Sequence, residues 1–147
     1  MFADLKEPQS ILIVDDTELN RDILSIIFSQ DHPLLMAESA AQASKILQEK
    51  KEEICAILLD YIMPETNGLD FLEWAKKEHL VDNIPVFLVT AEENNEVAQR
   101  AYNLGVMDYI LRPISPYIVQ RRVESVIELY SARRKLMYLL DKQKAPE

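Results

Sequence analysis

Three acidic residues of the 147-residue chain each follow a short apolar run. Asp15 and Asp16 come after Ser10-Ile-Leu-Ile-Val14, and Asp60 comes after Ile54-Cys-Ala-Ile-Leu-Leu59. Carboxylates held close together repel one another unless protons or a cation intervene. Oxygen ligands suit a hard ion such as Mg²⁺, which keeps several waters and accepts one or two carboxylates together with phosphate oxygens. The three acids are therefore candidates for a metal site, provided that the fold brings them together.

Two further polar residues, Thr90 and Arg112, stand in comparable places, where the apolar runs Val86-Phe-Leu-Val89 and Asp108-Tyr-Ile-Leu111 end. If these runs are parallel strands, their carboxyl ends meet at one edge of a sheet, which is where open α/β sheets bind their ligands. We therefore expect the hydroxyl and the guanidinium to lie beside the three acids.

The rest of the chain supplies the elements that would position these side chains. Short apolar runs alternate with longer segments of helical period, a pattern typical of a parallel sheet covered by helices on both faces. We predict strands at 10–14, 33–37, 54–59, 86–89 and 108–111, each followed by a helix. In the strand order 2-1-3-4-5 the first and third strands are neighbours, so their acids converge. The predicted fold class is α/β, a doubly wound five-stranded parallel sheet with an extended C-terminal helix.

Local signals place the ends and buried faces of these helices. Asp16 or Thr17 would cap the first helix, Ser39-Ala-Ala-Gln42 has the form of a capping box, and Gly105 would end the fourth helix in a left-handed conformation. In the third helix, Leu69, Leu72 and either Trp74 or Ala75 are expected to face the core. The core side of the first helix is predicted from four apolar residues on one helical stripe, namely Leu19, Ile23, Ile26 and Ile27.

The last helix is predicted to be unusually long. From Pro116 to about Lys142 it would extend about 40 Å at 1.5 Å per residue, more than a sheet of short strands needs for cover. Residues on it alternate four and three apart in a heptad seam: Val119, Val123, Val126, Tyr130, Arg133, Met137 and Leu140. Two interpretations stay open, a coiled-coil stalk and a single helix folded back on its own domain. We divide the chain into a domain at 1–130 and a helical extension at 131–147, which looks like a linker to an output domain outside this sequence.

Composition excludes several classes of partner. With 25 acidic and 16 basic residues, the net charge of −9 opposes direct contact with nucleic acid. No stretch approaches the ~18 apolar residues of a membrane span, and the start of the chain does not resemble a signal peptide, so we predict no membrane contact and a cytoplasmic location. The single cysteine, Cys55, is expected in the core, and His32 and His79 are expected at the surface or in loops.

Four segments of the chain resemble the receiver domains of two-component response regulators, a family with a flavodoxin-like (βα)5 fold. The segments lie in register over roughly residues 9 to 130, which makes the resemblance specific. They are Ile13-Val-Asp-Asp16, Leu59-Asp-Tyr-Ile-Met-Pro-Glu-Thr-Asn-Gly68, Pro85-Val-Phe-Leu-Val-Thr-Ala91 and Gly105 through Asp108-Tyr109 to Arg112-Pro113.

The resemblance implies a role for each candidate residue. Asp60 would accept a phosphoryl group, and Asp15, Asp16, Asp60 and the backbone carbonyl of Ile62 would hold Mg²⁺ or another divalent cation such as Mn²⁺ or Ca²⁺. Thr90 would donate its hydroxyl to a phosphoryl oxygen, and Tyr109 would be the aromatic side chain that changes rotamer when Thr90 moves. The implied partner is a histidine kinase or phosphotransfer protein. The domain would signal and not act as an enzyme, apart from assisting its own phosphorylation and dephosphorylation at Asp60.

Arg112 departs from the family pattern, which usually has lysine at this position. Arginine keeps the positive charge, but its planar fork is bulkier and is not geometrically equivalent to an ammonium. This departure supports an alternative function, a receiver-like docking or dimerisation module that works without phosphorylation. In either case we expect a homodimer through the C-terminal helix. The segment from Pro113 to Tyr130 also resembles receivers attached to cyclic-dinucleotide synthases or HD-type phosphodiesterases.

Overall fold

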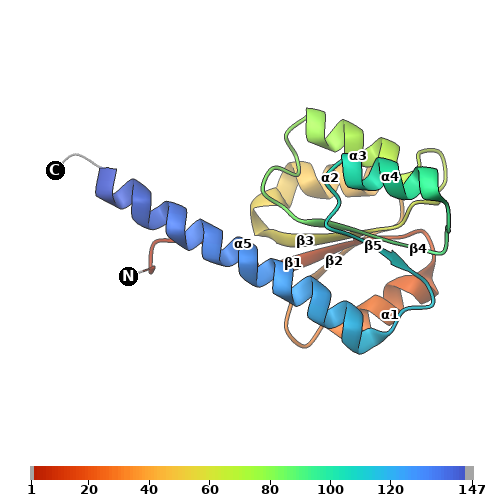
Figure 1. Ribbon diagram of the computed structural model, residues 1–147, viewed down its shortest axis with the longest axis horizontal. Coiled ribbons are helices and arrows are strands. Elements are labelled where there is room, and N and C mark those ends of the chain that lie inside the picture. The colour runs from red at the N-terminus through yellow and green to blue at the C-terminus, as the bar shows by residue number, and fades with distance from the viewer. Residues whose placement is uncertain (1, 145–147) are drawn as a thin grey trace.

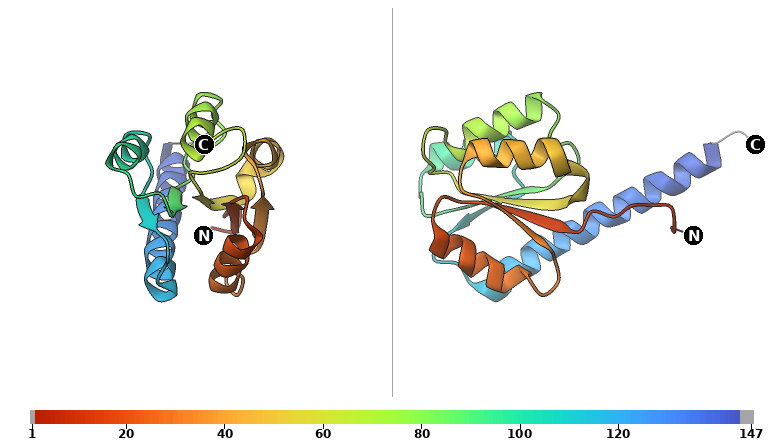
Figure 2. Two further views of the ribbon diagram at one scale, coloured as in Figure 1. Left: turned by 90° about the vertical axis from the view of Figure 1, so that its right-hand side faces the viewer. Right: turned by 180° about the vertical axis from the view of Figure 1, so that it is seen from behind.

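The protein is a five-stranded parallel sheet between two layers of helices, seen in a computed structural model that describes residues 2–144 (Figures 1 and 2). The strand order is β2-β1-β3-β4-β5, so the predicted topology is confirmed. The strands are β1 (Ser10–Val14), β2 (Leu34–Ala37), β3 (Ile54–Leu59), β4 (Val86–Thr90) and β5 (Asp108–Leu111). The helices are α1 (Glu18–Phe28), α2 (Ala40–Lys50), α3 (Gly68–Lys77), α4 (Asn95–Asn103) and α5 (Pro116–Lys144), with a short 3₁₀ turn η1 (Lys51–Glu53) before β3.

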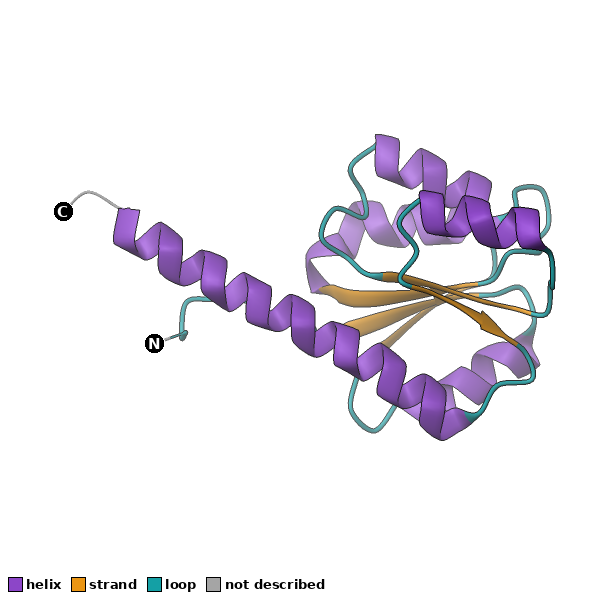
Figure 3. Cartoon of the chain, viewed as in Figure 1, coloured by secondary structure: helices purple, strands orange, loops and turns teal. Residues whose placement is uncertain are grey.

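The two faces of the sheet carry separate hydrophobic cores. Helices α2, α3 and α4 cover one face, and α1 with the first half of α5 covers the other (Figures 1 and 3). Every residue of β1 and β3 is buried, as expected for central strands covered on both sides. Continuous apolar runs therefore specify the two strands whose carboxyl ends carry the acids.

Several local predictions are confirmed. Ser39 caps α2 by accepting a hydrogen bond from the backbone N–H of Gln42, and Gly105 has φ +89°, the left-handed conformation that ends α4. Ala75 lies in the core, whereas Trp74 is 38% exposed. Cys55 is buried, and its burial raises the pKa of the thiol to about 11, so at neutral pH it is a protonated core residue.

The predicted core stripe of α1 was wrong for three of its four residues, and only Ile27 packs against the core. Leu24 and Phe28 face the core, whereas Leu19 and Ile26 are 66% and 78% exposed. Apolar residues lie on two overlapping stripes of this helix, so periodicity alone cannot choose the inward face. The choice follows from tertiary packing, in which Phe28 fills the space between the sheet and α5.

His32 lies in a loop, between α1 and β2, as the sequence analysis allows, but it is not a surface residue. Its side chain is only 10% exposed, and its ring nitrogens lie 2.6 Å from Oε1 of Glu124 and 2.9 Å from the carbonyl oxygen of Gln9. The imidazole therefore connects the α1–β2 loop to α5 and to the entry of β1. His79, in contrast, is exposed in a loop as expected.

Helix α5 extends well beyond the sheet (Figures 1 and 3). Its first half packs on the domain through Val119 and Val123, and its second half projects. The segment before β1 runs beside the projecting half, where Glu7 pairs with Arg134 at 2.7 Å and accepts a hydrogen bond from Ser131. The rings of Phe2 and Tyr138 lie 6.0 Å apart further along. Over residues 2–144, no helix has the length and apolar content needed to cross a membrane.

The buried contact of His32 leads to a stability prediction. Glu124→Ala should lower the free energy of unfolding by about 1–3 kcal/mol, because a buried ring nitrogen loses its carboxylate partner. Urea denaturation measures this, and the exposed Glu128→Ala on the same helix is the control. Equal losses in both variants would show that the contact with His32 contributes nothing to stability.

Candidate metal and phosphoacceptor site

The three acids meet at the carboxyl edge of β1 and β3. One carboxylate oxygen from each of Asp15, Asp16 and Asp60 lies within 4.8 Å of the others. The parallel register explains why the acids meet. Val14 is paired with Leu59 at the ends of the two strands, and an acid directly follows each of these residues. Within residues 2–144, no other set of three or more His, Cys, Asp or Glu side chains is grouped closely enough to share an ion.

The acids differ in burial and in hydrogen bonding. Asp15 and Asp60 are 1% and 7% exposed, whereas Asp16 is exposed to solvent. Oδ1 of Asp15 accepts a hydrogen bond of 2.9 Å from the backbone N–H of Thr17, and Oδ1 of Asp60 accepts one of 2.7 Å from the N–H of Tyr61. These bonds fix two of the carboxylates before any ligand arrives. An exposed third acid leaves the group open to water on one side.

The prediction that Asp16 or Thr17 caps α1 is confirmed in position, because Thr17 is the N-cap residue. Its hydroxyl, however, makes no capping hydrogen bond. The carboxylate of Asp15 accepts the hydrogen bond from the backbone of Thr17 instead. A side chain that belongs to the acidic cluster thus also fixes the turn into α1.

The environment of Asp60 favours its neutral form. Burial raises the pKa of the carboxyl above its ordinary value, and the Asp15 carboxylate acts in the same direction. The side chains of Thr90 and Arg112 oppose this rise. The crowded acids therefore form a site whose charge is incompletely balanced by the protein, which is what a bound divalent cation would correct. Their oxygen donors and their separation fit such an ion.

Arg112 reaches the acids from the end of β5. Its Nη2 donates a 2.6 Å hydrogen bond to Oδ2 of Asp15, and its Nη1 lies 3.5 Å from Oδ2 of Asp60. The sheet supports this reach, since the backbone N–H of Arg112 donates to the carbonyl of Thr90 on the neighbouring strand. The guanidinium thus spans the acids of β1 and β3 at the same time.

Thr90 and Tyr109 are linked through the loop after β4. Thr90 is fully buried, and its Oγ1 accepts a 3.2 Å hydrogen bond from the backbone N–H of Glu92. The hydroxyl of Tyr109, on β5, donates to the backbone carbonyl of the same Glu92. Burial raises the pKa of the Tyr109 hydroxyl, so it stays a donor at neutral pH. A displacement of this loop therefore affects both side chains.

The loop after Asp60 folds back on the strand that it leaves. The backbone N–H of Gly68 donates to the carbonyl of Tyr61 at 2.7 Å, and a Cβ atom on Gly68 would lie 2.0 Å from the carbonyl oxygen of Asp60. Only glycine permits this approach. Ile62 lies inside the loop with its side chain largely exposed.

Sequence reasoning missed two side chains around Asp15. Arg21 donates a 2.8 Å hydrogen bond to the backbone carbonyl of Asp15, and Asn20 lies 3.4 Å from its Oδ1. Both come from the first turns of α1, where no short motif marks them. Their position follows from the direction in which α1 leaves the sheet.

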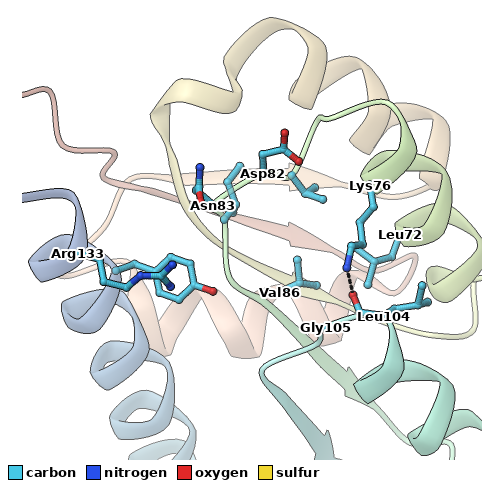
Figure 4. Close-up of a pocket in the computed structure, with 11 residues that line it drawn as sticks. Leu72, Lys76, Asp82, Asn83, Val86, Leu104, Gly105 and Arg133 are labelled. Atoms are coloured by element: carbon cyan, nitrogen blue, oxygen red, sulfur yellow. Dashed lines mark hydrogen bonds between the residues drawn. The ribbon is translucent and has the colours of Figure 1, made fainter. Parts of the chain in front are cut away.

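A pocket of about 240 Å³ lies at the opposite edge of the sheet, where β4 and β5 begin (Figure 4). It is lined by residues such as Leu72, Val86 and Arg133, and the ammonium of Lys76 contacts the carbonyl of Leu104 there. None of the residues expected to do chemistry lines it. The predicted site residues therefore lie at the carboxyl edge, away from this pocket.

The burial of Asp60 leads to a prediction about pH. Folding raises the pKa of Asp60 above its ordinary value of 3.8. Between that value and the raised pKa, the folded protein binds more protons than the unfolded chain. The free energy of unfolding therefore falls as the pH rises through this range. In the presence of a chelator, Asp60→Asn should be more stable than the wild type at neutral pH, with the difference shrinking on acidification. Denaturation at several pH values measures this, with the exposed Asp22→Asn as control. A destabilised Asp60→Asn would contradict the interpretation.

Comparison with known proteins identifies relatives. The sequence profile of the family described as "Response regulator receiver domain" matches residues 11–124. The phosphate regulon transcriptional regulatory protein PhoB of Pseudomonas aeruginosa is 31% identical over 122 residues, covering 81% of this chain and 52% of that protein. A probable cyclic di-GMP phosphodiesterase of Vibrio cholerae is 31% identical over 119 residues, covering 81% of this chain and 26% of that protein. The chain thus spans about half of the length of the first relative and about a quarter of the second.

A solved structure supports the same assignment at the level of fold. The CheY-like response regulator receiver domain protein from Methanospirillum hungatei superposes with a TM-score of 0.77 at 23% identity, covering 86% of this chain and 99% of that one. The profile match extends over most of the sheet and its helices, including the acids of β1 and β3. This chain belongs to the family of response-regulator receiver domains, the signalling domains of two-component systems.

Proposed function

We propose that this domain accepts a phosphoryl group on Asp60 from a histidine kinase or phosphotransfer protein, with Mg²⁺ or a similar divalent cation beside it. The observation that carries the proposal is the convergence of Asp15, Asp16 and Asp60 within 4.8 Å at the ligand-binding edge of the sheet. The cation would be held by these carboxylates and by the carbonyl of Ile62. When bound, it neutralises negative charge on the phosphoryl oxygens.

The protein's own residues would position the reaction. The bond from Tyr61 N–H orients the Asp60 carboxylate, which forms the new oxygen–phosphorus bond as the bond from phosphorus to the donor's nitrogen breaks. The hydroxyl of Thr90 and the guanidinium of Arg112 would each donate to a phosphoryl oxygen. Movement of Thr90 toward that oxygen would pull the loop at Glu92, to which Tyr109 is bonded. Tyr109 would then change rotamer and alter the surface near α4 and β5.

A neighbouring apolar surface supports a protein as the phosphodonor. Leu19, Ile23 and Ile26 are exposed along α1, the helix that begins at the ligand-binding edge. Ile23 also lines a groove of about 440 Å³ together with Arg112 and Ile114. Exposed apolar side chains next to a charged site are typical of a protein contact. We propose that a helix of the kinase or phosphotransfer protein docks here and presents its phosphohistidine to Asp60.

The proposal includes the wider context of the domain. It would signal from the cytoplasm through regulated contacts, and it would catalyse nothing beyond its own phosphorylation and dephosphorylation. Residues 1–130 would form the receiver, and residues 131–147 would connect it to an output segment. The similarity to a probable cyclic di-GMP phosphodiesterase agrees with an output in cyclic-dinucleotide signalling.

A second function, docking without phosphorylation, is favoured by one observation. Arg112 replaces the usual lysine and already neutralises Asp15 and Asp60 in part. A receiver held in one state by such a contact could bind partners constitutively. The two functions differ in whether Asp60 reacts.

Chemical phosphorylation distinguishes the two functions. Incubation with Mg²⁺ and acetyl phosphate should add the mass of one phosphoryl group, and Asp60→Asn should abolish the adduct because the nucleophilic carboxylate is lost. Intact-mass spectrometry measures the adduct, and Asp22→Asn should retain it. If the wild type gains no mass with acetyl phosphate or with phosphoramidate, the docking module is the better description.

We also propose that the projecting half of α5 forms a homodimer. The first part of the heptad seam, at Val119 and Val123, is used by the domain's own core, so only the part from Tyr130 onward is available. Arg133 lies over the ring of Tyr130 at 5.0 Å, and Met137 and Leu140 are 57% and 39% exposed. Two copies would cover these side chains in parallel, and phosphorylation would change their register.

Light scattering tests the dimer. Met137→Glu should lower the dimer population by about tenfold or more, because a charge at a seam position is desolvated on pairing. Leu136→Glu is the matched control, since Leu136 is also 57% exposed but lies off the seam. A wild-type chain that stays monomeric both with and without acetyl phosphate would remove the proposed mechanism.

A further inference from the structure

We infer that Arg112 is a tethered cation that competes with the divalent metal for the carboxylates of Asp15 and Asp60. The inference rests on the metal site of the proposed function and adds that Arg112 regulates how readily the metal binds there. In the metal-free protein the guanidinium would neutralise the site, and binding of the metal would require it to leave.

Arg112 contacts two of the carboxylates that would bind the metal. Two different nitrogens of one guanidinium face Oδ2 of Asp15 at 2.6 Å and Oδ2 of Asp60 at 3.5 Å. The side chain of Arg112 is 15% exposed and that of Asp15 is 1% exposed, so this pair is far less screened by solvent than a surface ion pair. The exposed Asp16 has no contact of this kind with Arg112 among the ion pairs of residues 2–144.

A metal ion and this guanidinium cannot both keep these contacts. Mg²⁺ requires oxygen ligands at about 2.0–2.1 Å in nearly octahedral geometry. An ion bound to carboxylates that Arg112 contacts at hydrogen-bond distance would place two cations side by side in a buried site, and their repulsion is weakly screened there. Metal entry and the contact between Arg112 and Asp15 are therefore mutually exclusive states.

A groove beside the acids can accommodate the Arg112 side chain after it leaves them. Arg112 also lines the groove of about 440 Å³ between α1 and the β5–α5 connection, together with Asn20, Ile23 and Pro113. A guanidinium released from Asp15 remains at the edge of the sheet where β4 ends. There it is available to the oxygens of an arriving phosphoryl group. Occupation by metal would thus convert Arg112 from a counterion of the acids into a ligand of the substrate.

The planar fork explains why arginine suits this role. Arginine presents several donors in fixed directions, whereas lysine presents one compact ammonium. A lysine at position 112 would have to reach both carboxylates from a single nitrogen, whereas Arg112 uses two, so we expect its competition with the metal to be weaker. The competition lowers the apparent metal affinity by the fraction of molecules in which the site is free. If the contact is formed in about nine of ten molecules, the affinity is reduced about tenfold.

Calorimetric titration with MgCl₂ tests the inference without any phosphodonor. Arg112→Gln should bind Mg²⁺ about tenfold more tightly than the wild type, with Arg112→Lys between the two. Arg21→Gln is the matched control, because Arg21 also lies beside Asp15 but donates to its backbone carbonyl and to Glu38, not to the carboxylate. If Arg21→Gln tightens binding as much as Arg112→Gln, general charge repulsion and not competition is responsible.

Thermal unfolding gives a second measurement. In the presence of a chelator, Arg112→Gln should have a lower melting temperature than the wild type, since the acids lose their counterion. Saturating MgCl₂ should raise the melting temperature of Arg112→Gln more than that of the wild type. Equal Mg²⁺ affinity and equal gain in both proteins would overturn the inference. Absence of Mg²⁺ binding by every variant would overturn the metal site as well. Tighter binding by Arg112→Gln in a chain that acetyl phosphate does not modify would support the competition and refute the phosphoacceptor function.

Discussion

The mutual repulsion of three carboxylates at one edge of a parallel sheet is the constraint on which the site depends. The register of β1 with β3 forces Asp15 and Asp60 together, and burial removes the solvent that would otherwise screen them. Neighbouring groups partly offset this electrostatic repulsion. Backbone N–H groups of Thr17 and Tyr61 and the guanidinium of Arg112 all point at the acids. The charge that remains uncompensated makes the site suitable for a cation.

Hydrogen bonds connect the side chains at this edge to the loops around it. Thr90 and Tyr109 are bonded to opposite sides of Glu92, so the loop after β4 is shared by a residue beside the acids and a residue on β5. The β3–α3 loop is held against Asp60 by the close approach of Gly68. One loop at this edge is thus held by a close backbone contact, whereas the other is held by hydrogen bonds to two side chains.

Much of the architecture could be predicted from the sequence, because buried parallel strands have continuous apolar runs and polar residues mark their ends. The five strands, the helix termini at Ser39 and Gly105 and the convergence of the acids follow from such local signals. The inward face of α1 could not be predicted in this way, since apolar residues lie on more than one side of that helix. The burial of His32 was also beyond prediction, because it depends on Glu124, 92 positions away in the chain. The place of Arg112 beside the acids was predicted from the end of its strand, but the carboxylate oxygens that it contacts were not.

The segment that runs from Phe2 to the start of β1 gives α5 a second point of support. The sheet holds the helix at Val119 and Val123, and Glu7 holds it further out at Arg134. A helix held at two separated points bends less readily than one held at a single point. Trimming the first nine residues would leave only the contact with the sheet and make the projecting half of α5 easier to bend.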